Sequence, residues 1–415
     1  MINGADTAWL LVSACLVLFM TPGLALFYGG MVRAKSALNM MMMSFSAMGL
    51  VTIIWVLYGY SIAFGKDHGG IIGDLSHIGL KDTLSSTVGA EGHAVPTLAF
   101  AMFQLTFAII TVALLSGAIA DRVKFSSWLV FVAAWITLIY APVSHWVFAS
   151  GGWITSHLGA LDFAGGTVVE INSGASALAL ALVIGKRNGF KRDPMRPHNL
   201  PLVLLGAGIL WFGWFGFNGG SALTSGALAA TALINTQIAG AAAAMTWVLT
   251  EKIRDGRATT LGVASGAVAG MVAITPACGF VNPLGALIIG LISGALSCWA
   301  VGLKYRFNYD DSLDVVGVHG VSGLFGMLMI GVLATSTANA LGGDGVLMRG
   351  GTELLQRQLI ASVVVALFSF FATLALAKFI QSTIGFRSKP EDESTGLDQV
   401  YHAESAYDIS SFTTR

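Results

Sequence analysis

Long stretches without a charged side chain limit what this chain can fold into more than any other feature. Eight such runs follow one another along the 415 residues, at 7–32, 36–65, 92–120, 125–161, 197–250, 258–303, 315–343 and 358–377. Each reaches about 20 residues, which is the length that an α-helix needs to cross the hydrocarbon of a bilayer. Only 11% of the residues are charged, against about 25% in ordinary soluble domains. The sequence therefore predicts an all-α integral membrane protein.

Two of the runs are long enough for two spans each, because the turn signals FNGGSALTSGA (217–227) and TPACGFVNP (275–283) interrupt them. A further stretch, 163–185, is about one bilayer long and contains a single charge. We therefore predict eleven transmembrane helices within one domain, 1–385, with the last helix at about 353–385. The polar tail, 386–415, is expected to be a cytoplasmic regulatory segment.

The distribution of Lys and Arg predicts the orientation. The loops after spans 1, 3, 5, 7 and 9 carry 14 of these residues, whereas the other loops carry only Lys66, Lys81, Arg349 and Arg357. Cytoplasmic loops are enriched in Lys and Arg, so we expect the N-terminus outside and the C-terminus in the cytoplasm. No basic segment precedes the first apolar run, and we expect no cleavable signal peptide.

Composition also argues against several functions. The net charge of zero argues against nucleic-acid binding. Cys15, Cys278 and Cys298 are too few and too scattered for a metal site and are expected to be free buried thiols. We predict no cofactor and no metal. Glycines at four-residue spacing predict close packing of helices, at Gly262, Gly266 and Gly270 and at Gly290 and Gly294.

Glu170, in TVVEINSGAS, is an acid in the middle of a predicted span. His319, in DVVGVHGVSG, is the only histidine near the middle of another. Gly174 and Gly323 follow them by four residues, which suggests an inverted five-plus-five repeat with halves at about 7–186 and 197–334. A lone His319 could be a neutral core residue bound to a carbonyl. A matching acid favours a functional pair that exchanges a proton.

Aromatic clusters occur at FQLTF (103–107), SHWVF (144–148) and WFGWFGFNGGS (211–221), and they are expected in the outer half of the protein. Membrane aromatics are most often anchors or packing residues. However, aromatic faces next to the Ser221 hydroxyl suit a small cation that donates a hydrogen bond. Asp162 and Asp314 each precede a span. We expect Asp162 to cap its helix, and Asp314 either to cap its helix or to join a polar network.

The motifs together resemble the ammonium transporter (Amt/Mep/Rh) family, in order and over nearly the whole chain. They are ALFYGGMVRAKSALNMMM, MFQLTFAIITVALLSGAIADRVKF, GALDFAGGTVV, WFGWFGFNGGSAL, ITPACGFV, DVVGVHGVSG and GLDQVYHAESAYD. The resemblance implies a homotrimer in the cell (inner) membrane. Each subunit is expected to have the eleven-helix ammonium transporter fold and its own narrow pore.

The resemblance also implies roles for individual residues. Phe107, Phe148 and Ser221 correspond to the site that recruits ammonium. Phe107 and Phe217 correspond to a stacked gate. The remaining matches are expected in the vestibule, the pore wall or the supporting structure, and they are Phe103, Asp162, Trp214 and Thr275.

Two positions depart from the family pattern. The family usually carries two facing histidines below the gate; His319 is the second of them, and Glu170 replaces the first, as in a subset of fungal relatives. Phe148 stands where most relatives have Trp, which is the stronger cation-π partner. We expect Glu170 to accept a proton from ammonium and to pass it toward His319, while neutral ammonia crosses an apolar pore.

The predicted function is therefore transport of ammonium, and of methylammonium as a further candidate. One alternative is an ammonium sensor that conducts little, although we expect the tail to be too short for an appended signalling domain. Another is a channel for a different small neutral solute. An enzyme is not expected, because no nucleophile-base set or metal cluster accompanies Glu170. The tail resembles the family segment that transmits the docking of PII-type signal proteins.

Overall fold

A computed structural model of the chain, which describes residues 1–407, shows a bundle of membrane-length helices. Within these residues, ten helical segments are long and apolar enough to cross a membrane, and the shorter apolar helix α10 is the eleventh. The count of eleven spans is confirmed. Residues 408–415 of the predicted tail lie outside the described residues.

The helices of the first half are α1 (Gly4–Met31), α2 (Ala37–Ile54), α3 (Tyr60–Phe64), α4 (Thr97–Leu115), α5 (Phe125–Trp135), α6 (Ala141–Phe148) and α7 (Asn172–Ile184). Those of the second half are α8 (Leu200–Gly220), α9 (Ala227–Asp255), α10 (Thr260–Ile274), α11 (Pro283–Ala300), α12 (Leu303–Phe307) and α13 (Ser322–Leu333). The last span is α14 (Glu353–Thr383), and two short helices, α15 (Pro390–Thr395) and α16 (Leu397–His402), follow it.

Several spans are built from two helices joined by a π-helical turn. The turns η2 (Trp55–Gly59) and η5 (Ile136–Tyr140) join α2 to α3 and α5 to α6. The turns η7 (Gly166–Ile171) and η8 (Val316–Val321) lead into α7 and α13. The polar loop between α3 and α4 contains two antiparallel strand pairs, β1 (Asp67–His68) with β2 (Ile72–Gly73) and β3 (Thr87–Val88) with β4 (Val95–Pro96).

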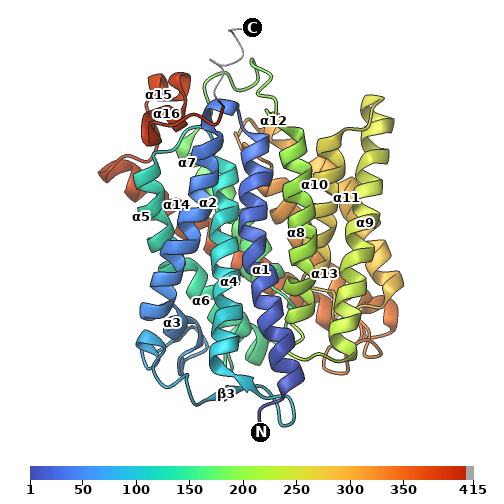
Figure 1. Ribbon diagram of the computed structural model, residues 1–415. Coiled ribbons are helices and arrows are strands. Elements are labelled where there is room, and N and C mark those ends of the chain that lie inside the picture. The colour runs from blue at the N-terminus through green and yellow to red at the C-terminus, as the bar shows by residue number, and fades with distance from the viewer. Residues whose placement is uncertain (408–415) are drawn as a thin grey trace.

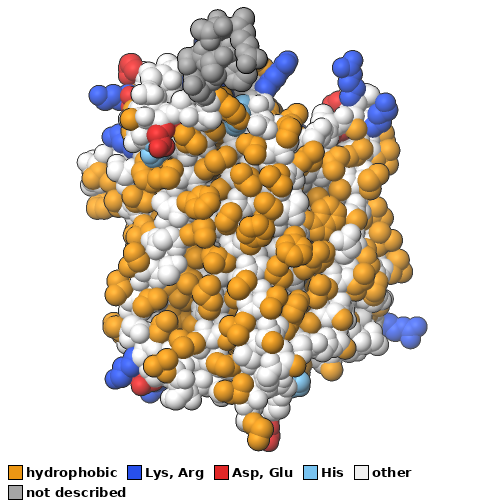
Figure 2. All heavy atoms as spheres, in the orientation of Figure 1, with side chains coloured by type: hydrophobic (Ala, Val, Ile, Leu, Met, Phe, Trp, Pro, Cys, Tyr) orange, Lys and Arg blue, Asp and Glu red, His pale blue; other side chains and the backbone are white. Residues whose placement is uncertain are grey.

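The long helices run side by side, so that the molecule has two opposite ends (Figure 1). The N-terminus and β3 lie at one end, which we call the N-terminal face. Helices α15, α16 and α12 lie at the other, which we call the C-terminal face. Figure 2 shows a broad band of hydrophobic side chains between the ends, with Lys and Arg gathered at the ends themselves. This distribution matches a bilayer around the middle of the bundle.

Small residues bring the helices into close contact, as the glycine spacing predicts. A Cβ atom on Gly270 of α10 or on Gly290 of α11 would lie 2.3 or 2.5 Å from the carbonyl oxygen of Ala239. One on Gly294 would lie 2.3 Å from the carbonyl oxygen of Ala243. Both glycine rows therefore pack on the same side of α9, backbone against backbone.

The three cysteines are free, but the expectation that all are buried was wrong for one of them. Cys278 and Cys298 are buried, whereas Cys15 is exposed. Cys15 lies on the face of α1 that carries the exposed side chains of Leu11 and Phe19. An apolar side chain on a membrane span can face outward, and for this reason hydropathy could not decide the burial of Cys15.

The segment after α14 folds back onto the start of α2. The Asp398 carboxylate accepts hydrogen bonds from the backbone N–H groups of Leu38 and Asn39, at 3.0 and 2.7 Å. The residue before α2, Ser36, makes no capping hydrogen bond with its own side chain. A buried acid some 360 positions along the chain thus caps this helix and complements its dipole.

Candidate functional site

Two ionisable side chains meet inside the bundle. Glu170 lies on η7 and His319 on η8, and the Nδ1 atom of His319 is 2.7 Å from Oε2 of Glu170. The residues are only 1% and 4% exposed. At this distance one proton is shared, because either the imidazole donates to a carboxylate or a carboxylic acid donates to the imidazole. The structure thus brings together the two residues that the weak sequence repeat places in matching positions.

Glycines let the two halves come close enough for this contact. A Cβ atom on Gly174 would lie 2.1 Å from Cα of Gly320, and one on Gly323 would lie 2.6 Å from Cβ of Glu170. Cβ atoms essentially never approach other atoms closer than 3.0 Å. The EINSG and HGVSG motifs therefore cross at a point where no side chain fits on either backbone.

Both residues lie on π-helical turns of six residues rather than on regular α-helix. Such turns are rare in proteins and occur frequently at functional sites. The matching position of η7 and η8 in the two halves agrees with the inverted repeat. Hydrophobic periodicity does not distinguish a π-turn from α-helix, so this feature could not be predicted.

Asp162 fixes the backbone that enters η7. Its Oδ1 atom accepts hydrogen bonds from the N–H groups of Gly165 and Gly166, at 2.8 and 2.6 Å. Its Oδ2 atom accepts from the N–H and the hydroxyl of Thr167, at 2.7 and 2.5 Å. This is the geometry of a helix cap, and it holds the turn that carries Glu170.

Asp311 is the counterpart of Asp162 in the second half, and reasoning from the sequence missed it. Its Oδ2 atom accepts a hydrogen bond from the N–H of Val316 at 2.8 Å, at the start of η8. Asp162 precedes Glu170 by eight residues, and Asp311 precedes His319 by the same number. This equal spacing is the signal that could have identified it.

Asp314, which we expected to cap or to join a polar network, has the second of these roles. Its Oδ1 atom lies 2.6 Å from Nζ of Lys304, whose ammonium also donates to the carbonyl of Asp311 at 3.0 Å. Burial and the charge of Asp314 raise the pKa of Asp311 to about 6. The second cap is therefore a titratable group near the C-terminal face.

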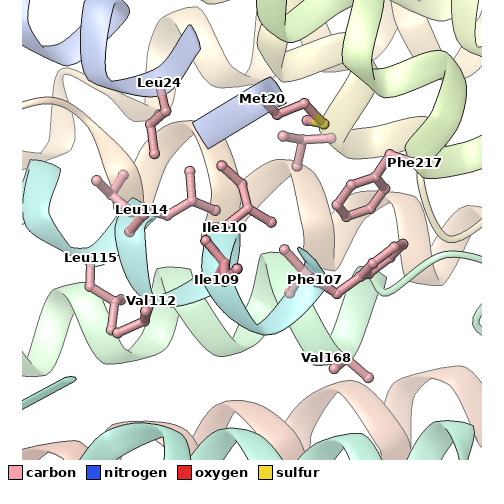
Figure 3. Packing of buried hydrophobic residues seen from close by; sticks show 14 of the residues in the cluster. Met20, Leu24, Phe107, Ile109, Ile110, Val112, Leu114, Leu115, Val168 and Phe217 are labelled. Carbon is pink, nitrogen blue, oxygen red and sulfur yellow. The ribbon is translucent and has the colours of Figure 1, made fainter. Parts of the chain in front are cut away.

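A narrow cavity runs beside the Glu170–His319 pair. About 10 Å³ of it is open to a water-sized molecule, which is close to the minimum of roughly 10–15 Å³ that holds one water. Apart from Glu170 and His319, the lining is apolar or aromatic and consists of Met20, Leu24, Phe27, Ile110, Leu114, Val169, Leu210, Trp214, Phe217 and Val268. Figure 3 shows several of these side chains projecting from α1, α4 and α8. The cavity can hold a small neutral molecule and offers a bare cation almost no polar partner.

Phe107 is the centre of an aromatic cluster at one side of this cavity. Its ring stacks on that of Phe217, with centroids 4.1 Å apart (Figure 3), and meets the edge of Phe148 at 6.5 Å. Phe103 lies 4.8 Å from the Phe107 ring. Since Phe217 lines the cavity, the stack closes the cavity on this side. Phe107 is thus in ring contact with both of the other phenylalanines proposed for recruitment and gating, Phe148 and Phe217.

Ser221 lies one turn beyond Phe217, at the end of α8. Its hydroxyl donates a hydrogen bond to the carbonyl of Phe217 at 2.8 Å. Because its only proton is used in this way, the oxygen is left to accept a hydrogen bond from another donor. The residue is only partly buried.

Trp214 and Thr275 are joined across two spans. The indole N–H of Trp214 donates to the hydroxyl of Thr275 at 2.8 Å, and the Trp214 ring lies 5.7 Å from that of Phe217. Both residues are buried. This contact links α8 to the end of α10 and supports the Phe217 side of the stack.

At the end of α6, the ring of Phe148 contacts the ring of Phe107. Two tryptophans, Trp146 and Trp153, lie near Phe148 in the chain. The Trp146 ring packs against Phe368 of α14, at 4.7 Å, and lies 6.0 Å from Trp153. These two rings are therefore used in packing within the bundle.

Comparison of the sequence with known proteins identifies one family. A model of the Ammonium Transporter Family matches residues 8–407. The chain is 54% identical to a protein named "Ammonium transporter" from Mycobacterium tuberculosis (strain H37Rv), over 98% of this chain and 91% of that protein. It is 47% identical to the "Ammonium transporter" of Bacillus subtilis (strain 168), over 97% and 98%.

Solved structures agree with this result. The crystal structure of Mep2 from Candida albicans matches with a TM-score of 0.88 and 33% identity, over 94% of this chain and 88% of that chain. A structure titled "Sensor Amt Protein" matches with a TM-score of 0.87 and 29% identity, over 96% and 98%.

Proposed function

The chain belongs to the ammonium transporter family, and we propose that it moves ammonium across a membrane through the cavity that Glu170 and His319 line. One observation carries this proposal. An acid and an imidazole lie 2.7 Å apart in a cavity whose other walls are apolar or aromatic. A pair that exchanges protons at such a place can take a proton from ammonium, and the remaining neutral ammonia fits the apolar walls.

Recruitment takes place at Phe107, Phe148 and Ser221, on the side of the gate away from the pair. Aromatic faces attract a cation. The Ser221 oxygen accepts a hydrogen bond from it, because the Ser221 hydroxyl already donates its proton to the Phe217 carbonyl. Potassium interacts with the rings but donates no hydrogen bond. Ammonium therefore has an advantage at this first step.

The gate is the stack of Phe107 on Phe217. One ring must turn aside to let the substrate reach the cavity. Glu170 then accepts the proton of ammonium and passes it toward His319, while ammonia crosses. A potassium ion has no proton to give and would have to lose its hydration shell without compensation.

The decisive experiment compares the wild type with Glu170→Gln in proteoliposomes, with ammonium uptake and the accompanying current as readouts. Glutamine keeps the size of the side chain but takes up no proton, so we expect uptake to fall by about a hundredfold, the loss typical when a positioned base is removed. Glu170→His restores a proton acceptor and serves as the matched control. Undiminished transport by Glu170→Gln would remove the carboxylate from the proton path.

A second candidate function is an ammonium sensor with little conduction, and the similarity to the "Sensor Amt Protein" supports it. Saturable ammonium binding by the reconstituted wild type, without uptake, would select the sensor. A third candidate is a channel for a different neutral solute. Uptake of such a solute that is unaffected by Ser221→Ala would select this channel, because a neutral solute makes no use of the cation site.

We also propose a homotrimer in the cell (inner) membrane, with the N-terminal face outside and methylammonium as a second substrate. The strongly basic loops at the C-terminal face support this orientation. The resemblance of the motifs to the family supports the assembly, because it implies a homotrimer. Native mass spectrometry of the purified protein tests the trimer, and a monomer under these conditions would contradict it.

The docked tail is proposed as a regulatory element and the C-terminal face as the docking site of a PII-type signal protein. The contact of Asp398 with the start of α2 supports the first part, because it connects the tail to a membrane span. Binding of a purified PII-type protein to the wild type and to Asp398→Ala tests both parts. Equal affinity for the two would show that the docked tail is not needed for binding of the PII-type protein.

A further inference from the structure

His145 of α6 is a fully buried histidine outside the cavity, and both of its ring nitrogens face hydrogen-bond acceptors. Nδ1 lies 2.9 Å from the carbonyl oxygen of Ala63, at the end of α3. Nε2 lies 2.8 Å from Oδ1 of Asp67, the first residue of β1. His145 itself is 0% exposed, whereas the Asp67 side chain is 28% exposed at the N-terminal face.

These contacts determine how many protons the pair holds. A backbone carbonyl only accepts, so Nδ1 of His145 carries a proton. The proton between Nε2 and Asp67 is then a second one, whichever of the two atoms it is bonded to. The hydrogen bond from His145 holds the pKa of Asp67 below its ordinary value, which favours a carboxylate at Asp67. If this proton is lost, one ring nitrogen of His145 presents a lone pair to an oxygen, either to Oδ1 of Asp67 at 2.8 Å or to the carbonyl of Ala63 at 2.9 Å, and that contact becomes repulsive.

The His145–Asp67 contact and two further hydrogen bonds attach the β1–β2 hairpin to α6 and to the segment that follows α6. Oδ1 of Asp67 also accepts the N–H of Gly70 at 2.8 Å, which shapes the hairpin turn. The N–H of Trp153 donates to the carbonyl of Gly70 at 3.0 Å. The indole N–H of Trp146 donates to the carbonyl of Ile71 at 2.8 Å. The hairpin therefore holds the chain on both sides of Phe148.

Phe148 is the last residue of α6, three positions after His145. Its ring meets Phe107 edge-on, with an interplanar angle of 89°, and its tip lies beside Gly165 at the start of η7. The next residue, Ala149, has an extended rather than a helical backbone. The direction of this ring consequently depends on how firmly α6 and the segment after it are held.

Other titratable groups around Asp67 are few. The charge of His157 on η6 (Ile154–Leu158) also lowers the pKa of Asp67. Lys66 and His68 are the chain neighbours of Asp67. His157 is the one histidine from another element that could imitate an effect of His145 on Asp67. It therefore needs its own control.

We infer that His145 and Asp67 are positioning residues for recruitment: their shared proton holds Phe148 against Phe107, and its loss at alkaline external pH loosens the site. This inference rests on the proposed role of Phe148 and on the N-terminal face being outside. It predicts an effect on the half-saturating concentration of ammonium rather than on the maximal rate. The chemistry at Glu170 is not involved.

The test measures ammonium uptake by proteoliposomes at about pH 6 and about pH 8, the range across which an imidazole changes charge. The half-saturating concentration is expressed as the ammonium ion. Asp67→Ala should raise it by roughly threefold to tenfold at about pH 6, the loss expected when a cation-π contact weakens, with the maximal rate within about twofold of the wild type. The wild type should lose affinity toward about pH 8, whereas Asp67→Ala should be insensitive to this change.

Asp67→Asn is the conservative variant. Its amide can donate to the neutral Nε2 of His145 at either pH, although Gly70 then loses its acceptor. Its half-saturating concentration should therefore lie between those of the wild type and Asp67→Ala and should not change with pH. His157→Gln should keep the pH response of the wild type.

Phe148→Ala separates failure of the inference from failure of the proposed function. A raised half-saturating concentration in Phe148→Ala, together with a wild-type value in Asp67→Ala, would overturn the role of the pair and leave recruitment at Phe148 intact. A wild-type value in Phe148→Ala would contradict the recruitment proposal itself. Loss of the pH response in His157→Gln, or its persistence in Asp67→Asn, would also overturn the inference.

Discussion

The Nδ1 atom of His319 lies 2.7 Å from Oε2 of Glu170, so an acid and an imidazole share one proton inside the bundle. The resemblance to the family leads us to expect two histidines at these positions. Two neutral imidazoles carry no charge, whereas this pair carries a negative charge whenever its proton leaves. A fixed negative charge attracts every cation, potassium included. The replacement therefore bears on selectivity as well as on proton transfer.

Glu170→His should improve the discrimination of ammonium over potassium. Removing one fixed charge changes the free energy of a nearby cation by about 1 kcal/mol or more, which corresponds to a change in the transport ratio of at least about fivefold. Currents of ammonium and potassium in reconstituted membranes give this ratio. Glu170→Asp keeps the charge and should keep the ratio of the wild type. Equal selectivity of Glu170→His and the wild type would contradict an effect of the Glu170 charge on selectivity.

Phe148→Trp should strengthen recruitment. The indole is a better cation-π partner than the phenyl ring, and the gain at a partly exposed position is about 0.5–1 kcal/mol. We expect the half-saturating ammonium concentration to fall by about twofold to fivefold. Phe148→Leu, which keeps an apolar side chain without a π-face, should raise it. If Trp and Leu at this position gave the same value, the ring would not contact the cation.

Gly174→Ala should separate the two halves of the site. Its Cβ atom would lie 2.1 Å from Cα of Gly320, so the spans that carry Glu170 and His319 must move apart. Overpacking of this kind costs about 1–3 kcal/mol of unfolding free energy, and transport should fall because the pair no longer meets. Gly208→Ala is the matched control, since nothing lies within 4 Å of its Cβ position. Thermal unfolding in detergent compares the two, and equal midpoints would contradict the tight crossing.

Part of this arrangement could be predicted from the sequence. The spans follow from the length of the uncharged runs, and the meeting of Glu170 with His319 was expected because each is followed by glycine after four residues. Hydropathy carries this information because the bilayer selects apolar side chains and penalises a buried charge. The same reasoning could not determine which side of α1 exposes Cys15.

The contacts that could not be predicted join segments far apart in the chain. Asp67 meets His145 across 78 positions, and Asp398 meets Leu38 across 360. Both acids lie in polar loops or tails, where charged side chains are ordinary and carry no periodicity. Their partners become visible only when the fold brings a hairpin or a tail onto a helix.

Asp398→Ala should release the tail from α2. Loss of a capping acid costs about 0.5–2 kcal/mol, so hydrogen exchange of the backbone amides of residues 397–407 should speed up by roughly twofold to thirtyfold. The amides of Leu38 and Asn39, which donate to this carboxylate, should also exchange faster. Gln399→Ala changes the exposed neighbouring residue and should leave the exchange unaltered. Unchanged protection in Asp398→Ala would mean that other contacts hold the tail.

Asp311→Asn should change how stability depends on pH. Burial and the charge of Asp314 raise the pKa of Asp311 from 3.8 to about 6. Between these values the folded protein binds a proton that the unfolded chain has released, so the free energy of unfolding falls as the pH rises through this window. The loss is complete above about pH 6 and amounts to on the order of 2–3 kcal/mol.

Asparagine keeps an oxygen that accepts the N–H of Val316 but does not titrate at this site. The variant should therefore gain stability relative to the wild type as the pH is raised. Thermal unfolding in detergent at about pH 4.5 and about pH 7.5 measures the difference, which should favour Asp311→Asn at the higher value. A difference that stays constant between the two conditions would show that Asp311 is ionised throughout, with Lys304 compensating its charge.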